Sequence, residues 1–118
     1  AESVLRAMDA FGMYYPMYKL GEEKGRILER EIAAMPSQPK TAVELGSFLG
    51  YSALRTARSL AQGGRMYCIE YNPMHAEVAQ QVLQHAGLAD RVTFVVGIST
   101  EKLPSVAPMS GRADLVFL

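Results

Sequence analysis

The chain has 118 residues, 49% of them hydrophobic, and its 12 basic and 12 acidic side chains balance. This length suits one modest domain, and the composition excludes both a disordered tail and the basic surface of a nucleic-acid-binding protein. No uncharged apolar run approaches the ~18 residues of a membrane span, and a lone cysteine, Cys68, excludes a disulfide framework, which together predict a soluble, cytoplasmic protein.

The first third of the chain has helical periodicity. Apolar spacing predicts helices over residues 2–11 and 22–35, the second ending at Pro36. The stretch between them, MYYPMYKLG at 13–21, is aromatic and broken by a proline. We expect it to form a loop with partly exposed side chains.

From residue 40 onward, short apolar runs alternate with helical segments. Crossover helices are predicted over 51–62 and 73–86, the second with Asn72 as its cap and Pro73 in its first position. The last crossover contains two prolines and is predicted to hold only a short helix. The runs that we expect to be strands are 41–45, 65–70, 92–96 and 113–118. The pattern predicts an α/β fold, a parallel sheet with flanking helices and right-handed crossovers, in one domain with N-terminal helices at 1–37 and a βαβ core at 40–118.

Ligands of open parallel sheets bind beyond the carboxyl ends of the strands. After the first strand, Gly46 and Gly50 can open the backbone, the following helix N-terminus can receive an anion, and Ser52 can add a hydroxyl. An isolated glycine pair is more often a plain strand-to-helix turn. A nicotinamide-binding domain is disfavoured because Phe48 replaces the middle glycine of the dinucleotide fingerprint, and no lysine follows Gly50 as a phosphate-binding P-loop requires.

The ends of the second and third strands carry further candidates. Glu70 is placed to accept both hydroxyls of a ribose, and Tyr71 offers a flat face for an adenine. With the glycine turn upstream, a ligand role for Glu70 is favoured over a solvated charge. Gly97, Ser99 and Thr100 could read an adenine edge, although capping of the next helix explains the two hydroxyls equally well. The histidines, at positions 75 and 85, do not share a helix face and are not expected to bind metal.

Together, the segments VELGSFLGYSALRTARSL, MYCIEYNP, QQVLQHAGLADRVTFVVGIS and ADLVFL resemble the first half of the catechol O-methyltransferase family, which belongs to the class I S-adenosylmethionine-dependent enzymes. The resemblance implies a Rossmann-like methyltransferase fold that stops after its fourth strand. It implies S-adenosylmethionine contacts from Leu20, Glu44, Gly46 and Ser52 at the amino acid end. Other contacts would come from Glu70 at the ribose, Tyr71 at the adenine and Ser99 at its edge.

Two positions depart from the family pattern. Phe48 stands where the family commonly has a tyrosine behind the sulfonium, and Tyr18 replaces a methionine that lines the acceptor pocket. Phe48 has no hydroxyl, so any role of the family's tyrosine hydroxyl is lost. The change at Tyr18 leaves the preference for a methyl acceptor open.

The resemblance also implies the reaction. In this family Mg2+ holds two vicinal hydroxyls of a catechol-like acceptor, a lysine assists deprotonation, and the oxygen attacks the methyl group in line. The metal ligands and that lysine follow the strand that matches ADLVFL, so Mg2+ is expected only with further C-terminal residues and this chain alone is expected to be inactive. A non-catalytic methyltransferase-like binding or assembly module is the alternative. An exposed edge at 113–118 predicts self-association or pairing with a second chain.

Overall fold

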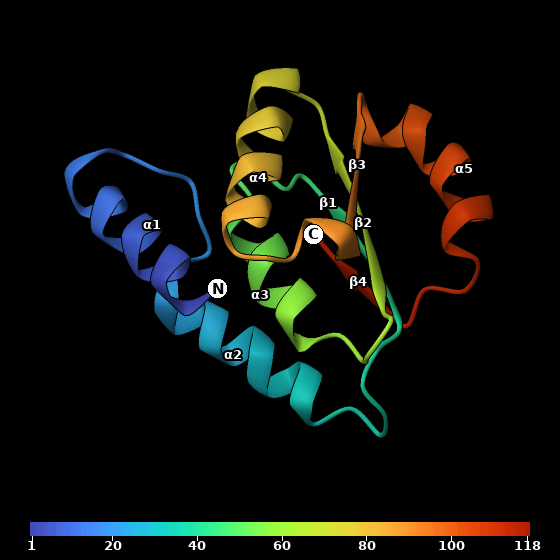
Figure 1. The fold of residues 1–118 in the computed structure, drawn as a ribbon. Helices are drawn as coiled ribbons and strands as arrows, with labels where there is room; N and C mark the ends of the chain where they lie inside the picture. Colours follow the sequence, from blue (N-terminus) through green and yellow to red (C-terminus); the bar gives the residue numbers. More distant parts are fainter.

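A computed structural model describes all residues from Ala1 to Leu118 (Figure 1). No helix in it has both the length and the apolar character needed to span a bilayer. In chain order the elements are α1 (Glu2–Tyr14), α2 (Gly21–Ala33), β1 (Thr41–Leu45), α3 (Tyr51–Ser59), β2 (Arg65–Glu70), α4 (Pro73–His85), the short 3-10 helix η1 (Ala89–Arg91), β3 (Val92–Val96), α5 (Ser99–Ser110) and β4 (Leu115–Phe117).

The four strands form one parallel sheet in the order β3-β2-β1-β4. Val43 of β1 is the register partner of Tyr67 in β2 and of Val116 in β4. The predicted α/β fold with a parallel sheet is therefore confirmed. Three of the four strands have the predicted bounds, and β4 is shorter than the predicted 113–118. β4 occupies one edge of the sheet, and self-association through it stays a prediction.

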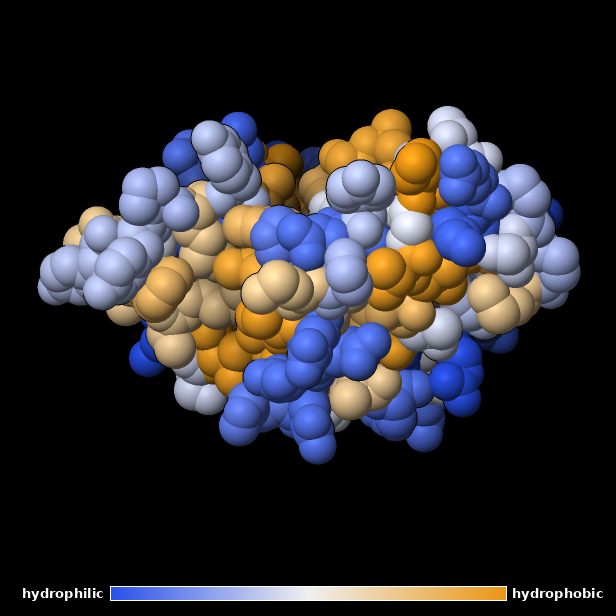
Figure 2. Space-filling view, turned by 90° about the horizontal axis from the view of Figure 1, so that it is seen from above, coloured by the Kyte–Doolittle hydropathy of each residue, from blue (hydrophilic) through white to orange (hydrophobic).

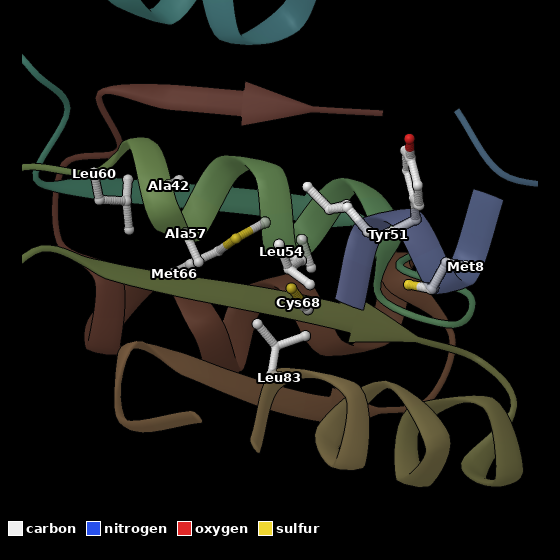
Figure 3. Close-up of a cluster of buried hydrophobic side chains, with 11 residues drawn as sticks. Met8, Ala42, Tyr51, Leu54, Ala57, Leu60, Met66, Cys68 and Leu83 are labelled. Carbon is white, nitrogen blue, oxygen red and sulfur yellow. The ribbon is translucent and has the colours of Figure 1, made fainter. Parts of the chain in front are cut away.

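Helices cover the two faces of the sheet unequally. On one face α3 and α4 pack against alternate residues of the strands, and α1 and α2 pack outside them (Figure 1). Figure 3 shows the apolar cluster on this face, where Leu54 and Leu83 meet Met66 and Cys68. Complete burial of each leucine stabilises the fold by about 1.5–3 kcal/mol. This cluster fixes α3, and with it the turn that precedes the helix.

The opposite face is covered by α5, and here the prediction of a short helix was wrong. The helix has 12 residues and contains Pro104 and Pro108. Each proline removes one backbone donor, so the carbonyl groups of Thr100 and Pro104 lose their usual helical partner; both residues are exposed, and water can reach these carbonyls. Val106 on the other side of the helix is fully buried against Val43 and Ile69, and this packing stabilises the whole segment.

Smaller differences lie at the ends of the other helices. α1 continues to Tyr14, three residues beyond its predicted end, so the connecting loop starts at Tyr15. α2 ends at Ala33 and α3 at Ser59, before the predicted ends at 35 and 62. The predicted start of α4 is confirmed, because the Asn72 side chain accepts hydrogen bonds from the first-turn backbone and Pro73 follows it.

Candidate cofactor-binding site

The turn between β1 and α3 uses three residues with positive φ: Gly46 at 82°, Phe48 at 47° and Gly50 at 86°. The two glycines serve different purposes. A Cβ on Gly50 would lie 3.1 Å from the side chains of Ala79 and Leu83, so this glycine lets the turn pack against α4. A Cβ on Gly46 would meet no atom within 4 Å. Of the two, only Gly46 borders open space that a ligand could enter.

Glu70, at the end of β2, holds this turn in place. Its Oε2 accepts the backbone N–H of Phe48 at 2.7 Å, and its Oε1 accepts the backbone N–H of Asn72 at 3.0 Å. His75 Nδ1 lies 3.7 Å from the same Oε1, and its ring packs edge-on against Phe48 with 4.6 Å between centroids. The sequence pointed to Glu70 as a ligand residue and gave no signal of this structural role. Each carboxylate oxygen has a second lone pair, which leaves capacity for a ribose hydroxyl.

A cavity of about 180 Å3 opens beside the turn at the carboxyl edge of the sheet. Figure 2 looks onto this edge and shows patches of apolar side chains with hydrophilic side chains between them. Five of the predicted site residues line the cavity, namely Tyr18, Leu20, Gly46, Phe48 and Ser52. The 15–20 segment therefore meets the β1–α3 turn, although about 30 residues separate them in the sequence.

Two polar features of the cavity suit an anionic or zwitterionic ligand. The first turn of α3 leaves the backbone N–H groups of residues 51–53 without intrahelical partners, because the first intrahelical bond runs from Leu54 to Gly50. Such a helix start attracts a carboxylate or phosphate. The buried hydroxyl of Ser47 also has no hydrogen-bond partner. Ser47 was missed in the sequence because only the fold shows that its side chain is buried without one.

Glu44 lies beneath the cavity and does not line it. Its side chain is fully buried on the face of β1 covered by α3, where Ser52 Oγ donates a hydrogen bond to Oε1 and Cys68 Sγ lies 3.6 Å from Oε2. Burial raises the pKa of the Glu44 carboxyl to about 7, against the opposing effect of these two hydrogen bonds. Burial likewise raises the pKa of the Cys68 thiol. The Ser52 hydroxyl therefore donates its hydrogen bond to Glu44 and has no proton left to donate to a ligand.

The remaining predicted residues lie at the same edge of the sheet but outside the cavity. Tyr71 is 72% exposed just after β2. Gly97 follows β3 and donates its N–H to the Glu70 carbonyl oxygen at 2.9 Å. Ser99 and Thr100 begin α5, whose N-cap is Ile98 with no side-chain cap, so the capping alternative is not observed.

A larger cavity, about 610 Å3, lies elsewhere, between α1 and α4. It is lined mostly by apolar side chains, shares only Met17 and Leu49 with the smaller one, and contains none of the predicted site residues. Size alone does not mark the site, because specificity comes from a few placed polar groups. The smaller cavity has these groups, and we assign the candidate site to it.

The fold and the cavity together define a Rossmann-like α/β protein with a candidate ligand site at the first strand-to-helix turn. Comparison with known proteins narrows this class. A family model described as O-methyltransferase matches residues 4–118, and the chain belongs to this family. It is similar to catechol O-methyltransferase from Bos taurus, with 38% identity over 99% of this chain and 43% of the relative.

Solved structures agree with this assignment. The crystal structure of cofactor-bound Rv0187 from MTB superposes with a TM-score of 0.81 at 38% identity, over 98% of this chain and 50% of that one. The O-methyltransferase TomG from Streptomyces achromogenes in complex with SAM has a TM-score of 0.83 at 28% identity, over 99% of this chain and 53% of that one. The chain thus spans about half the length of the relatives it matches.

Proposed function

We propose that this chain binds S-adenosylmethionine (SAM) and serves as the cofactor-binding part of a catechol-type O-methyltransferase, as a single domain with helices at 1–37 and a βαβ core at 40–118. The observation that carries the proposal is the β1–α3 turn, where open space at Gly46 meets an uncapped helix start and the Glu70 carboxylate. Membership of the O-methyltransferase family and the SAM complex of TomG support it. When bound, SAM supplies an electrophilic methyl group on a sulfonium.

The cavity suits the amino acid end of this cofactor. The N–H groups at the start of α3 would receive its carboxylate, and Leu20 would offer backbone atoms from the opposite wall. The volume of about 180 Å3 is smaller than the roughly 300–1,000 Å3 that enclose a drug-sized ligand. We infer that the nucleoside lies outside the cavity, with its ribose on Glu70 and its adenine between Tyr71 and the start of α5 near Ser99 and Thr100.

Phe48 and Tyr18 face the cavity from the turn and from the 15–20 segment. The Phe48 ring has a negative face that favours a nearby cation, so it would support the sulfonium without donating a hydrogen bond. Tyr18 is 93% exposed and would contact the methyl acceptor. A catechol-like small molecule is the acceptor class that we propose, because catechol O-methyltransferases are among the relatives.

Mg2+ does not fit the residues of this chain. No group of three or more His, Cys, Asp or Glu side chains could hold a metal ion within residues 1–118. A magnesium ion that takes part in the reaction would need oxygen ligands from outside these residues. We therefore assign no step of the transfer to a metal held by this chain.

Titration calorimetry with SAM and S-adenosylhomocysteine (SAH) tests the proposal. We expect saturable binding of both, with affinity reduced at least tenfold in Glu70→Ala, since bonds between a charged group and a ligand contribute about 1.5–3 kcal/mol. Glu77→Ala is the matched control, because Glu77 is an exposed acid on α4. Absence of SAM and SAH binding would refute the proposal. Binding without methyl transfer to a catechol in Mg2+ would support a cofactor-binding unit that needs further residues for the reaction.

A further inference from the structure

A polar cluster joins the 15–20 segment to two helices behind the cofactor cavity. The Lys19 ammonium group forms an ion pair with Asp9 Oδ1 on α1, and Tyr51 Oη, at the start of α3, donates a hydrogen bond to Asp9 Oδ2 at 3.0 Å. Lys19 Nζ also lies 4.8 Å from the centroid of the Tyr51 ring. Each of the three side chains contacts the other two.

This cluster differs from a surface ion pair. Lys19 and Asp9 have only 14% and 26% of their side chains exposed, and Tyr51 is 3% exposed. A Cβ on Gly12 would lie 2.7 Å from Lys19 Cε, so α1 has a glycine where the lysine stem passes. Exposed ion pairs contribute little to stability, whereas a partly buried pair that shares an aromatic ring interacts more strongly.

The Tyr51 hydroxyl is itself held in one orientation. Figure 3 shows the Tyr51 side chain at the edge of the apolar cluster, with its hydroxyl pointing away from the other labelled side chains. There the hydroxyl accepts a hydrogen bond from Arg55 Nη2 at 2.9 Å while it donates to Asp9. Arg55 is fixed in turn by Glu29 of α2 at 2.8 Å. Asp9 therefore meets a hydroxyl that belongs to the rigid part of the fold.

The 15–20 segment has few other polar connections. The backbone hydrogen bonds that its residues donate stay local, from Tyr15 to Phe11 at 3.0 Å and from Lys19 to Met17 at 2.9 Å. Met17 and Leu20 pack against the core, but apolar contacts are less directional than a charged pair. Lys19 is therefore the side chain through which this segment is tied to α1 and α3 by polar contacts.

We propose that Lys19, Asp9 and Tyr51 form a latch that fixes the 15–20 segment against the start of α3 and so holds one wall of the cofactor cavity in place. Lys19, Tyr51 and Leu20 all line that cavity, and so the latch couples the backbone at Leu20 to the helix start that receives the cofactor. Lys19 and Asp9 are positioning residues in this account. The effect on affinity rests on the proposed function, while the fixing of the segment does not.

The first test compares SAH affinity in the wild-type protein, Lys19→Met, Asp9→Asn and the double variant by titration calorimetry. Each single change is expected to raise the Kd for SAH about five- to twentyfold. The Kd of the double variant should not exceed the higher of the two single-variant values, because both changes open the same latch. Arg26→Met is the matched control, since it removes the exposed pair with Glu22 on α2. An unchanged Kd in both single variants, or effects that multiply in the double variant, would overturn the proposal.

The second test needs no cofactor. Chymotrypsin cleaves after exposed tyrosines, and Tyr18 in the segment and Tyr71 after β2 are 93% and 72% exposed. The latch predicts faster cleavage at Tyr18 in Asp9→Asn with the rate at Tyr71 unchanged. A general loss of stability would raise both rates together, and equal cleavage at Tyr18 in variant and wild type would equally refute the latch. If the wild-type protein fails to bind SAH while Asp9→Asn speeds cleavage at Tyr18, the proposed function fails and the latch stands.

Discussion

Glu70 holds the backbone of Phe48, 22 positions earlier in the chain, through a hydrogen bond of 2.7 Å from the Phe48 N–H to Oε2. Phe48 has a φ of 47°, the only positive value at a non-glycine residue. A side chain in this region costs about 1–2 kcal/mol. The buried carboxylate offsets that cost, so one residue both shapes the turn and faces the proposed ribose site.

Glu70→Ala is therefore expected to destabilise the protein even without ligand. Two backbone N–H groups, at Phe48 and Asn72, would lose their acceptor, at about 1–3 kcal/mol in the free energy of unfolding. Urea denaturation measures this value. Glu77→Ala on the exposed side of α4 should change stability by less than about 0.5 kcal/mol. Equal stability of the two variants would show that Glu70 does not hold the turn.

Replacing the two glycines of the turn by alanine should affect stability and SAH binding differently. Gly50→Ala combines a φ of 86° with contacts of 3.1 Å to α4, so we expect a loss of about 2–4 kcal/mol in the free energy of unfolding. Gly46 has a similar φ, but an added Cβ would meet only open space, so Gly46→Ala should lower the free energy of unfolding by about 1–2 kcal/mol. Because that Cβ would enter the space proposed for the ligand, most of the SAH affinity should also be lost.

Gly63→Ala is the control for these variants. Its φ is 74°, its Cβ would meet nothing within 4 Å, and it lies in the turn before β2 at the other end of the sheet. It should lose as much stability as Gly46→Ala while SAH affinity stays unchanged. If Gly46→Ala binds SAH as well as Gly63→Ala does, Gly46 is not at the ligand.

Stability should depend on pH through Glu44. Its pKa in the folded protein, about 7, lies above the ordinary value of 4.5, so the folded state keeps a proton that the unfolded state loses. Stability is therefore highest below about pH 4.5 for this group, falls as the pH rises to about 7 and then levels off. The full difference corresponds to about 3 kcal/mol.

Glu44→Gln isolates this contribution. The amide can still accept the Ser52 hydrogen bond but does not titrate. Backbone hydrogen bonds from Lys40 and Thr41 lower the pKa of Asp114, so its contribution to stability changes with pH in the opposite direction. This contribution is the same in the wild type and the variant. Urea denaturation at pH 5 and pH 8 measures the free energy of unfolding of both proteins. Relative to the wild type, the variant should be more stable at pH 8 than at pH 5. Equal differences at the two pH values would contradict a raised pKa.

Local sequence patterns predicted the strands better than the site. The runs at 41–45, 65–70 and 92–96 have the predicted bounds because each is a β-rich apolar segment with polar or glycine residues at its ends. The length of α5 escaped prediction because burial of Val106 outweighs two prolines.

The sequence predicted a site at the carboxyl ends of the strands, and Gly46 lines a cavity there. A ligand role for Glu70 stays a prediction, and no local pattern indicated its hydrogen bonds to the turn. The packing role of Gly50 against α4 and the contact of Lys19 with Tyr51 were missed, since each depends on a partner about 30 residues away. Such contacts exist only after the helices have packed, so no local pattern contains them.

Gly25 should reverse the usual rule for glycine in helices. It lies within α2, where Ala would ordinarily stabilise by about 1 kcal/mol. Here a Cβ would fall 2.2 Å from Arg55 Nε, and the Arg55 side chain is only 4% exposed and bonded to Glu29 and Tyr51. Gly25→Ala must displace this guanidinium from its partners, which costs about 3–5 kcal/mol for a buried pair and outweighs the gain in helix propensity. We expect Gly25→Ala to lower the free energy of unfolding, measured by urea denaturation, by at least about 2 kcal/mol. In an Arg55→Ala background, adding Gly25→Ala should instead raise it slightly. A stabilised Gly25→Ala single variant would show that Arg55 has another position within reach.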